Sequence, residues 1–337
     1  MNAERPKMMK AHDIKRAVLA LAAVAGMAIA IQAQEYPVNN QYYFNYYLVN
    51  PAVAGAAKCH YFMLTHKQQW MGIDDAPYTT SLSYQGRWRN SVGVGAYLYN
   101  DKNGYSKQQA AQLTFAYHIP MSNGSKYIHS VSYDRQLSFG LSAKGYLYGV
   151  DEDEFRNDVR AQMDRAMSDL DDVQAFNVNL GVYYESYGFY TGLSVTNLFR
   201  MKMPHYDGDL EPHIPFTGYF FLGNEFHLNE SEILDPTLMV MADANSCATI
   251  DVGLKYGRSL RSNGNDWAYW GGMTLRQNVD DGKYQALDLI AMGGFQYNKF
   301  HLGLAYDMTL NRLWRHNAGT LELMLGYTLC HTSRFCR

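Results

Sequence analysis

Histidine, serine and aspartate residues in this chain have the types that ester or peptide hydrolysis requires. His118, His129, His301 and Asp307 could join a serine in a nucleophilic relay. Their spacing places no serine beside a histidine, and the chain lacks the G-x-S-x-G turn that presents the nucleophile in many hydrolases. We therefore predict that the protein has no catalytic residues, with a hydrolase kept as an alternative.

Metal or cofactor chemistry has equally little support. His205 and His213 flank a loop that contains proline and acidic residues, and such a pair is more typical of a polar loop than of a metal site. The cysteines form no C-x-x-C pair, the spacing typical of structural zinc. Gly93 and Gly95 resemble glycines that make room inside a fold more than a phosphate-binding loop. We predict neither a metal nor a cofactor.

Two cysteines near the C-terminus are close enough in sequence to react with each other. Cys330 and Cys336 have five residues between them, and in an oxidising compartment they could close a small loop. Two free thiols fit the sequence equally well. Cys59 and Cys247 give no indication of a partner.

An acidic segment, residues 151–172, contains nine acidic and three basic side chains. Its apolar residues recur at helical spacing, which predicts one amphipathic helix within a loop. The stripe consists of Phe155, Val159, Met163, Met167 and Leu170. Such a helix could pack its stripe on a rim, or Phe155, Val159, Met163 and Met167 could dock a partner. The spaced acidic loop of a calcium site is absent.

A second candidate contact surface lies at residues 70–77. Gly72 and Pro77 are turn formers, so the segment fits a shaped hairpin loop. Trp70, Asp74 and Asp75 could also contact a partner protein from this loop.

The N-terminus has the features of a signal peptide. Basic residues precede the apolar stretch Ala17–Ile31, and Ala33 is a small residue suited to cleavage. We predict that residues 1–33 are removed. A membrane tether is the alternative, but fifteen apolar residues are short for a spanning helix.

Composition narrows the class of protein. The 337 residues carry a formal charge of −3, which does not suit a nucleic-acid binder. A mean hydropathy of −0.33 excludes a bundle of transmembrane helices. The chain is poor in charge, at 18%, and contains 28 tyrosines. That combination is typical of a transmembrane β-barrel.

Apolar and polar residues alternate along most of the chain. In 135–149, Phe139 and Leu141 alternate with Ser138 and Ser142, the pattern of a strand whose two faces meet different surroundings. The polar set predicted to face a lumen is Gln136, Ser142, Lys144, Asn177, Asn179 and Glu322.

Fourteen such segments can be counted, most of them long enough to cross a bilayer when tilted. They are 57–70, 78–88, 90–99, 107–119, 135–149, 176–185, 188–198, 214–227, 237–243, 247–257, 267–276, 284–296, 299–308 and 320–330. We predict an all-β fold: a transmembrane up-and-down antiparallel barrel over 57–330, with a short N-terminal segment and one helical extracellular loop. A soluble sandwich or propeller is the alternative.

Loop lengths suggest an orientation. The tightest connections follow even-numbered segments, as at Arg89-Asn90, Ser186-Tyr187 and Asn298-Lys299. Short turns are typical of the periplasmic side, so we predict periplasmic N- and C-termini, including a tail at 331–337. Residues 244–246 break this pattern because they form a short connection on the other side.

Residues 34–56 precede the predicted barrel and are too aromatic for a free linker. Asn50-Pro51 and Gly55 interrupt regular structure. We predict a plug that folds into the barrel, centred on Phe44, Asn50, Pro51 and Gly55. An ordinary periplasmic extension is the alternative.

An ordered series of motifs resembles one protein family. Residues 41–55 read QYYFNYYLVNPAVAG and residues 66–78 read HKQQWMGIDDAPY. Together with 92–104, 137–148, 181–199 and 305–329, they resemble the PorP/SprF family of type IX secretion outer-membrane proteins. The acidic segment and the C-terminal CHTSRFC tail do not follow the family pattern.

The resemblance implies a non-catalytic outer-membrane barrel that docks secretion machinery or receives the C-terminal domain of a secreted or gliding-adhesin cargo. The implied partners are periplasmic and outer-membrane secretion proteins, that cargo domain and membrane lipid, with no nucleic acid. Two alternatives are a porin or substrate-specific transporter with a polar lumen and a purely structural anchor.

Overall fold

A computed structural model describes most of the chain outside its two ends. The described residues are 40–73, 75–121, 135–151, 172–199, 201–202, 213–214, 216–243, 247–262, 265–280, 283–310 and 318–330. The predicted signal peptide and the predicted tail at 331–337 lie outside them.

Fourteen long strands build the fold. They are β1 (Cys59–Gln68), β2 (Tyr78–Arg89), β3 (Val92–Asn103), β4 (Ser106–Pro120), β5 (Arg135–Val150), β6 (Val173–Ser186), β7 (Phe189–Thr196), β10 (Thr217–Asn224), β12 (Glu232–Asp243), β13 (Cys247–Ser262), β14 (Asn265–Asp280), β15 (Lys283–Tyr297), β16 (Phe300–Thr309) and β17 (Thr320–Cys330).

Short elements complete the described structure. They are the 3-10 helices η1 (Asn40–Tyr43), η2 (Tyr46–Leu48) and η3 (Pro51–Val53), and the two-residue strands β8 (Met201–Lys202), β9 (His213–Ile214) and β11 (Phe226–His227). β8 pairs only with β9, and β11 extends the edge of β12. No helix in this part of the chain is long and apolar enough to cross a membrane.

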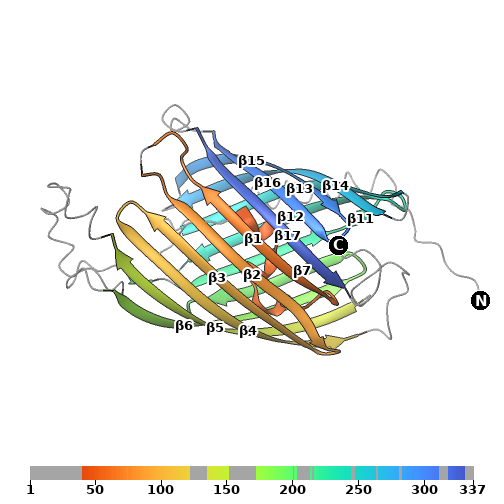
Figure 1. Cartoon of the computed structure of the whole chain (residues 1–337), viewed down its shortest axis with the longest axis horizontal. Helices are drawn as coiled ribbons and strands as arrows, with labels where there is room; N and C mark the ends of the chain where they lie inside the picture. Colours follow the sequence, from red (N-terminus) through yellow and green to blue (C-terminus); the bar gives the residue numbers. More distant parts are fainter. Residues whose placement is uncertain are drawn as a thin grey trace, which may run out of the picture.

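The long strands close into a barrel. Each is antiparallel to its neighbour in chain order, β10 pairs with β12, and the first strand pairs with the last along ten residues. Figure 1 shows the tilted strands wrapping around an interior that holds the short helices of the N-terminal segment. Closure removes the exposed sheet edges, so backbone groups are satisfied within the barrel.

The side chains are arranged with the polar face inward. On β4, Gln112 is 6% exposed whereas its neighbour Leu113 is 71% exposed. Adjacent residues of a strand point to opposite faces, so apolar residues cover the outside and polar residues meet in the lumen. An apolar outer wall is the arrangement that lipid requires.

The predicted fold class is confirmed. Each of the fourteen predicted segments corresponds to one long strand in the same order. The predicted helical loop is not confirmed: the described residues contain no α-helix, and residues 152–171 lie outside them.

Two connections differ from the predicted boundaries. β3 and β4 are longer than expected, so only Gly104 and Tyr105 join them, and Gly104 has the positive φ that a tight turn favours. β12 begins at Glu232 instead of 237. It extends through Pro236 because pairing with β10 begins only at Thr237.

We name the two ends of the barrel for reference below. The terminal end is where β1 begins and β17 ends, and the loop end is where β1 ends and β2 begins. The two-residue connection at Gly104 lies at the loop end, so short turns occur at both ends and loop length alone does not separate them.

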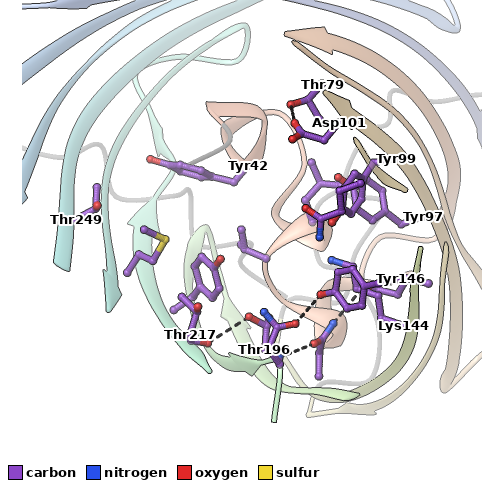
Figure 2. Close-up of a pocket in the computed structure, with 18 of the residues that line it drawn as sticks. Tyr42, Thr79, Tyr97, Tyr99, Asp101, Lys144, Tyr146, Thr196, Thr217 and Thr249 are labelled. Atoms are coloured by element: carbon purple, nitrogen blue, oxygen red, sulfur yellow. Dashed lines mark hydrogen bonds between the residues drawn. The ribbon is translucent and has the colours of Figure 1, made fainter. Parts of the chain in front are cut away.

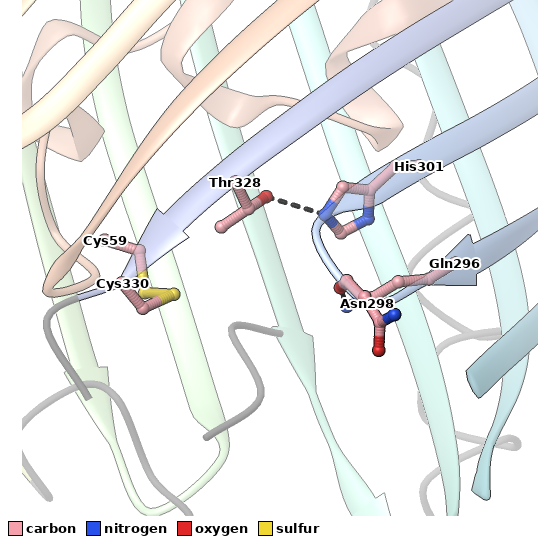
Figure 3. The surroundings of a disulfide bond; sticks show 6 residues. All are labelled: Cys59, Gln296, Asn298, His301, Thr328 and Cys330. Carbon is pink, nitrogen blue, oxygen red and sulfur yellow. Dashed lines mark hydrogen bonds between the residues drawn. A yellow bond between two sulfur atoms is a disulfide. The ribbon is translucent and has the colours of Figure 1, made fainter. Parts of the chain in front are cut away.

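A disulfide joins the first and last strands at the terminal end. Cys59 and Cys330 lie directly opposite each other in the β1–β17 pairing and are bonded (Figure 3). Both alternatives for Cys330, a bridge to Cys336 and a free thiol, are therefore wrong, and Cys59, which gave no indication of a partner, is the bonded residue. Barrel closure brings together residues 271 positions apart, which local spacing cannot indicate.

Removing this disulfide should lower the stability of the barrel. We expect Cys59→Ser to destabilise the barrel by roughly the 2–4 kcal/mol typical of a native disulfide. The variant should therefore lose its folded mobility in unboiled SDS gels at a lower temperature than the wild type. Reductant should reproduce the loss in the wild type. Cys247→Ser is the control, since Cys247 takes no part in this bond. Equal melting of the Cys59 and Cys247 variants would contradict the prediction.

Candidate functional site in the lumen

Residues 40–56 lie inside the barrel, and we call them the lumen segment. Their three short helices carry their own caps. The side chain of Asn45 accepts from Tyr47 N at the start of η2, and that of Asn50 accepts from Ala52 N at the start of η3. Pro51 occupies the first turn of η3, where a missing N–H costs nothing. The two asparagine caps and Pro51 satisfy or remove free N–H groups at the start of η2 and η3, so the segment does not need a long helix to be ordered.

Asn50 also fixes the lumen segment to the wall. It is fully buried, and its Nδ2 donates to the carbonyl of Val182 on β6 at 2.9 Å. Its Oδ1 accepts from Ala52 N at 2.9 Å. Because the amide offers both a donor and an acceptor, one side chain caps a helix and anchors it.

Glycines of the wall leave the space that the lumen segment occupies. A Cβ at Gly140 on β5 would lie 2.2 Å from Ala52 N, and one at Gly181 on β6 would lie 2.0 Å from Asn50 Oδ1. A Cβ at Gly93 on β3 would lie 1.9 Å from the oxygen of Ala54. All three face inward, which agrees with the expectation that Gly93 makes room in the lumen.

This close approach predicts the effect of filling the space. We expect Gly140→Val to destabilise the docked lumen segment by about 1–3 kcal/mol, since a well-packed interior resists added methyl groups. The segment should then be cut faster in limited proteolysis. Gly145→Val on the same strand is the matched control, because a Cβ there meets nothing within 4 Å. Equal cleavage of both variants would refute the close-packing argument.

Two wall side chains, Arg87 and Gln136, hold the end of the lumen segment nearest β1. Arg87 on β2 donates from Nε to the Gly55 carbonyl at 2.5 Å and from Nη2 to the Ala56 carbonyl at 2.8 Å. Gln136 donates to the same Ala56 carbonyl at 3.2 Å and accepts from Arg87 Nη2 at 2.6 Å. The backbone of Gly55 has φ +70°, where glycine is favoured.

His118 completes this cluster and lies beside a serine. Its Nδ1 is 2.8 Å from Ser138 Oγ and its Nε2 is 3.0 Å from the carbonyl oxygen of Ala54. The structure therefore brings together a His–Ser pair that sequence spacing did not indicate. A hydrolytic triad needs a carboxylate at the second nitrogen, where His118 has a backbone carbonyl, and the ring is fully buried.

Tyrosines of the lumen segment reach other parts of the wall. The Tyr42 hydroxyl donates to Asp251 on β13, and the Tyr46 and Tyr190 hydroxyls are 3.2 Å apart. The Tyr47 hydroxyl is 2.9 Å from Thr114 Oγ1. Burial raises the pKa of Tyr47 to about 12, so this hydroxyl stays protonated at neutral pH.

The aromatic residue Phe44 packs against the opposite side of the barrel. Its ring lies 5.1 Å from that of Trp270 on β14, in a tilted arrangement that aromatic pairs favour. Phe44 therefore contacts β14 while Asn50 bonds to β6, so the lumen segment reaches across the barrel between these two strands. Phe44, Asn50, Pro51 and Gly55 thus all contact the inner wall or border it.

Ion pairs cross-link the wall itself. Asp251 accepts from Arg276 Nε at 2.9 Å and from Nη2 at 2.8 Å, with both side chains almost fully buried. Lys67 Nζ lies 3.9 Å from Glu322 Oε1 in the β1–β17 seam. Buried charges occur in proteins when they are paired, and these pairs explain how a polar lumen is tolerated.

The side chains predicted to face the lumen lie on the inner face. Gln136, Ser142, Asn177, Asn179 and Glu322 are all at most 4% exposed. Most bond to other protein groups: Ser142 Oγ is 2.8 Å from Thr114 Oγ1, and Asn179 Nδ2 donates to Gln112 at 3.0 Å. They are therefore engaged within the protein instead of lining an open channel.

A cavity of about 120 Å³ remains between the lumen segment and the loop end (Figure 2). Tyr42 and Val49 of the lumen segment border it, together with inward side chains of the wall. Lys144, the remaining predicted lumen residue, faces this cavity.

The predicted partner-binding residues are only partly described. Trp70 is 42% exposed and Asp75 is also exposed, both in the loop between β1 and β2. Backbone hydrogen bonds join this loop to the one before β17, from Met71 N to the Gly319 carbonyl and from Ala318 N to the Met71 carbonyl. Asp74, Phe155, Val159, Met163 and Met167 lie outside the described residues, as does His205.

Several residues of the site were missed from the sequence. Arg87 and Asp251 gave no local signal, because their partners are far apart in the chain. Tyr42 belongs to the aromatic run that predicted the plug, but nothing in the sequence indicated its partner Asp251. The glycines at 140 and 181 did have a local signal: each occupies an inward position of an alternating strand, where a side chain would be expected. No group of His, Cys, Asp or Glu in the described part is arranged to hold a metal ion.

Comparison with known proteins agrees with this geometry. A family model described as type IX secretion system membrane protein PorP/SprF matches residues 31–327. The chain belongs to the PorP/SprF family. Membership makes this PorP/SprF barrel an outer-membrane component of type IX secretion, a system in which it interacts with other components. No curated protein sequence matches it.

Solved barrels share the general architecture. The CymD monoaromatic hydrocarbon channel is 10% identical, with a TM-score of 0.49 over 88% of this chain and 94% of that chain. The toluene transporter TodX of Pseudomonas putida is 10% identical, with a TM-score of 0.42 over 89% and 95% of the two chains. At these values the likeness carries no conclusion about substrate.

Proposed function

We propose that this PorP/SprF protein is a non-catalytic, plugged barrel that docks secretion machinery and receives the C-terminal domain of a secreted or gliding-adhesin cargo. The observation that carries the proposal is the lumen segment, which is bonded to the wall from β2 to β13. A filled barrel suits a binding platform better than a diffusive pore.

The remaining surfaces suit partner binding. The outer wall is apolar and suits lipid, and much of the inner wall is engaged with the lumen segment. Exposed polar and aromatic groups of the loops are therefore the groups available to other proteins. We place the terminal end in the periplasm, because the longest connections, residues 151–172 and 197–216, lie at the loop end and long loops are typical of the cell exterior. The loop between β1 and β2 then faces the cell exterior.

The loop between β1 and β2 is the favoured docking surface. Trp70 is exposed on a backbone held by hydrogen bonds of 2.9 Å and 2.8 Å to its neighbouring loop. A large aromatic side chain on a fixed backbone loses little conformational freedom on binding, and such residues are enriched among interface hot spots. The predicted stripe at Phe155 and Met163 would extend this surface.

Co-purification from native membranes in gentle detergent tests the proposal. The wild type should capture type IX components or a cargo C-terminal domain, and Trp70→Ala should lower the affinity by the 2 kcal/mol or more, about thirty-fold, of a hot spot. Trp88→Ala is the matched control for cargo capture at the outer loop, since Trp88 is 71% exposed but lies at the opposite, terminal end.

Each alternative predicts a different outcome. A porin would give steady conductance as the full-length protein and capture no secretion proteins. A purely structural anchor would retain periplasmic components yet bind no surface protein. A hydrolase would turn over ester or peptide substrates. Any of these results would replace the proposed function.

A further inference from the structure

The cavity at the loop end has an unusual lining. Tyr97 and Tyr99 of β3 and Tyr146 of β5 gather on one side of it (Figure 2). Amide side chains of Gln112 and Asn179 also border the space. Aromatic faces beside hydrogen-bonding amides are the usual composition of a small-ligand site.

A single ammonium group lies among these tyrosines. Lys144 Nζ is 4.7 Å from the ring centre of Tyr146, 4.9 Å from that of Tyr99 and 6.0 Å from that of Tyr97. Among the described residues, no carboxylate lies within ion-pair distance of it. The rings stabilise the cation through their faces but leave its charge uncompensated.

The carboxylates that border the same cavity are already engaged. Asp251 is paired with Arg276 and accepts from Tyr42. Asp101 accepts from Thr79 Oγ1 at 2.5 Å. These carboxylates keep their charge, so the cavity carries both signs. Lys144 is the cation on its tyrosine side, where the surrounding aromatic rings exclude much of the water that would otherwise screen it.

We propose that this cavity binds a carboxylate attached to a small group, with Lys144 pairing with the carboxylate and Tyr97, Tyr99 and Tyr146 packing against the attached group. The carboxylate could belong to a free organic acid or to the C-terminal end of a polypeptide. This site does not depend on the proposed docking function, because its evidence lies in the lumen.

Isothermal titration calorimetry on the detergent-solubilised full-length mature protein tests the site. The probes match the small cavity: N-acetylglycine, which has a free terminal carboxylate, its amide N-acetylglycinamide, and phenylacetate. The wild type should bind a carboxylate probe about ten-fold or more tightly than the amide, because a charge-assisted contact is lost. The tighter of the two acids identifies the source of the carboxylate.

Variants assign the effect to Lys144. Lys144→Met should abolish the preference for the acid, and Lys144→Arg should retain it. Lys102→Met is the matched control, because Lys102 carries the same charge near the loop end but pairs with Asp151 at 3.4 Å. The proposal is overturned if the wild type binds the amide as well as the acid, if it binds neither acid, or if Lys144→Met keeps the preference.

Discussion

Deleting residues 40–55 is expected to turn a barrel of low conductance into a steadily open pore in planar bilayers. The deleted residues fill the space between β2, β6 and β13 and bond to all three. Barrels of sixteen to eighteen strands enclose an aqueous channel, and a fourteen-stranded barrel approaches that size. We expect single-channel conductance to rise by at least about ten-fold over the full-length protein.

Two measurements keep this result interpretable. Folded mobility in unboiled SDS gels must show that the shortened protein still forms a barrel. Asn50→Ala, which removes one anchor and keeps the rest of the segment, should give brief openings instead of a steady current. A shortened, folded barrel that conducts no better than the full chain rules out a plugging role for the lumen segment.

Removing the positive partner of Asp251 should have the largest effect on stability among single substitutions in the wall. Asp251 and Arg276 are 1% and 3% exposed and share two short hydrogen bonds. Arg276→Met leaves the carboxylate buried without its cation. The expected loss is about 3–5 kcal/mol of unfolding free energy, measured by urea unfolding in detergent.

A double variant and a surface pair provide the controls. Arg276→Met with Asp251→Leu should recover much of the loss, because the most deeply buried carboxylate is then removed together with its cation. Asp307, whose Oδ2 lies 3.9 Å from Arg276 Nη1, also loses this cation but is 14% exposed. Lys107→Met should cost about 1 kcal/mol or less, although Lys107 Nζ lies only 2.7 Å from Asp151, because Lys107 is 44% exposed and water screens the pair. A double variant as unstable as Arg276→Met would show that packing, not charge, dominates.

The predictions that depend on neighbouring residues held well. The alternation of Ser138, Phe139 and Leu141 placed each side chain on the correct face, since strand geometry fixes a period of two wherever a strand forms. Boundaries were less accurate, as at β12, because Pro236 resembles a strand breaker and only the end of its pairing with β10 explains why it is tolerated.

Contacts between residues that are distant in the chain were not predicted. The partner of Cys330 is Cys59 because the last strand pairs with the first, whereas local spacing pointed to Cys336. Ser138 lies beside His118 because β4 pairs with β5 in one register. Neither contact can be read from spacing along the chain.

By itself the sequence determined the barrel, its strand order, the inner and outer faces and the family, because each follows from local periodicity or from motifs in order. Only the tertiary structure decided which residues meet inside: Asn50 over Gly181, Arg87 on the Gly55 carbonyl, and Lys144 among its tyrosines. Those contacts depend on strand register and closure, which join positions that are remote in the chain and carry no mutual signal within it.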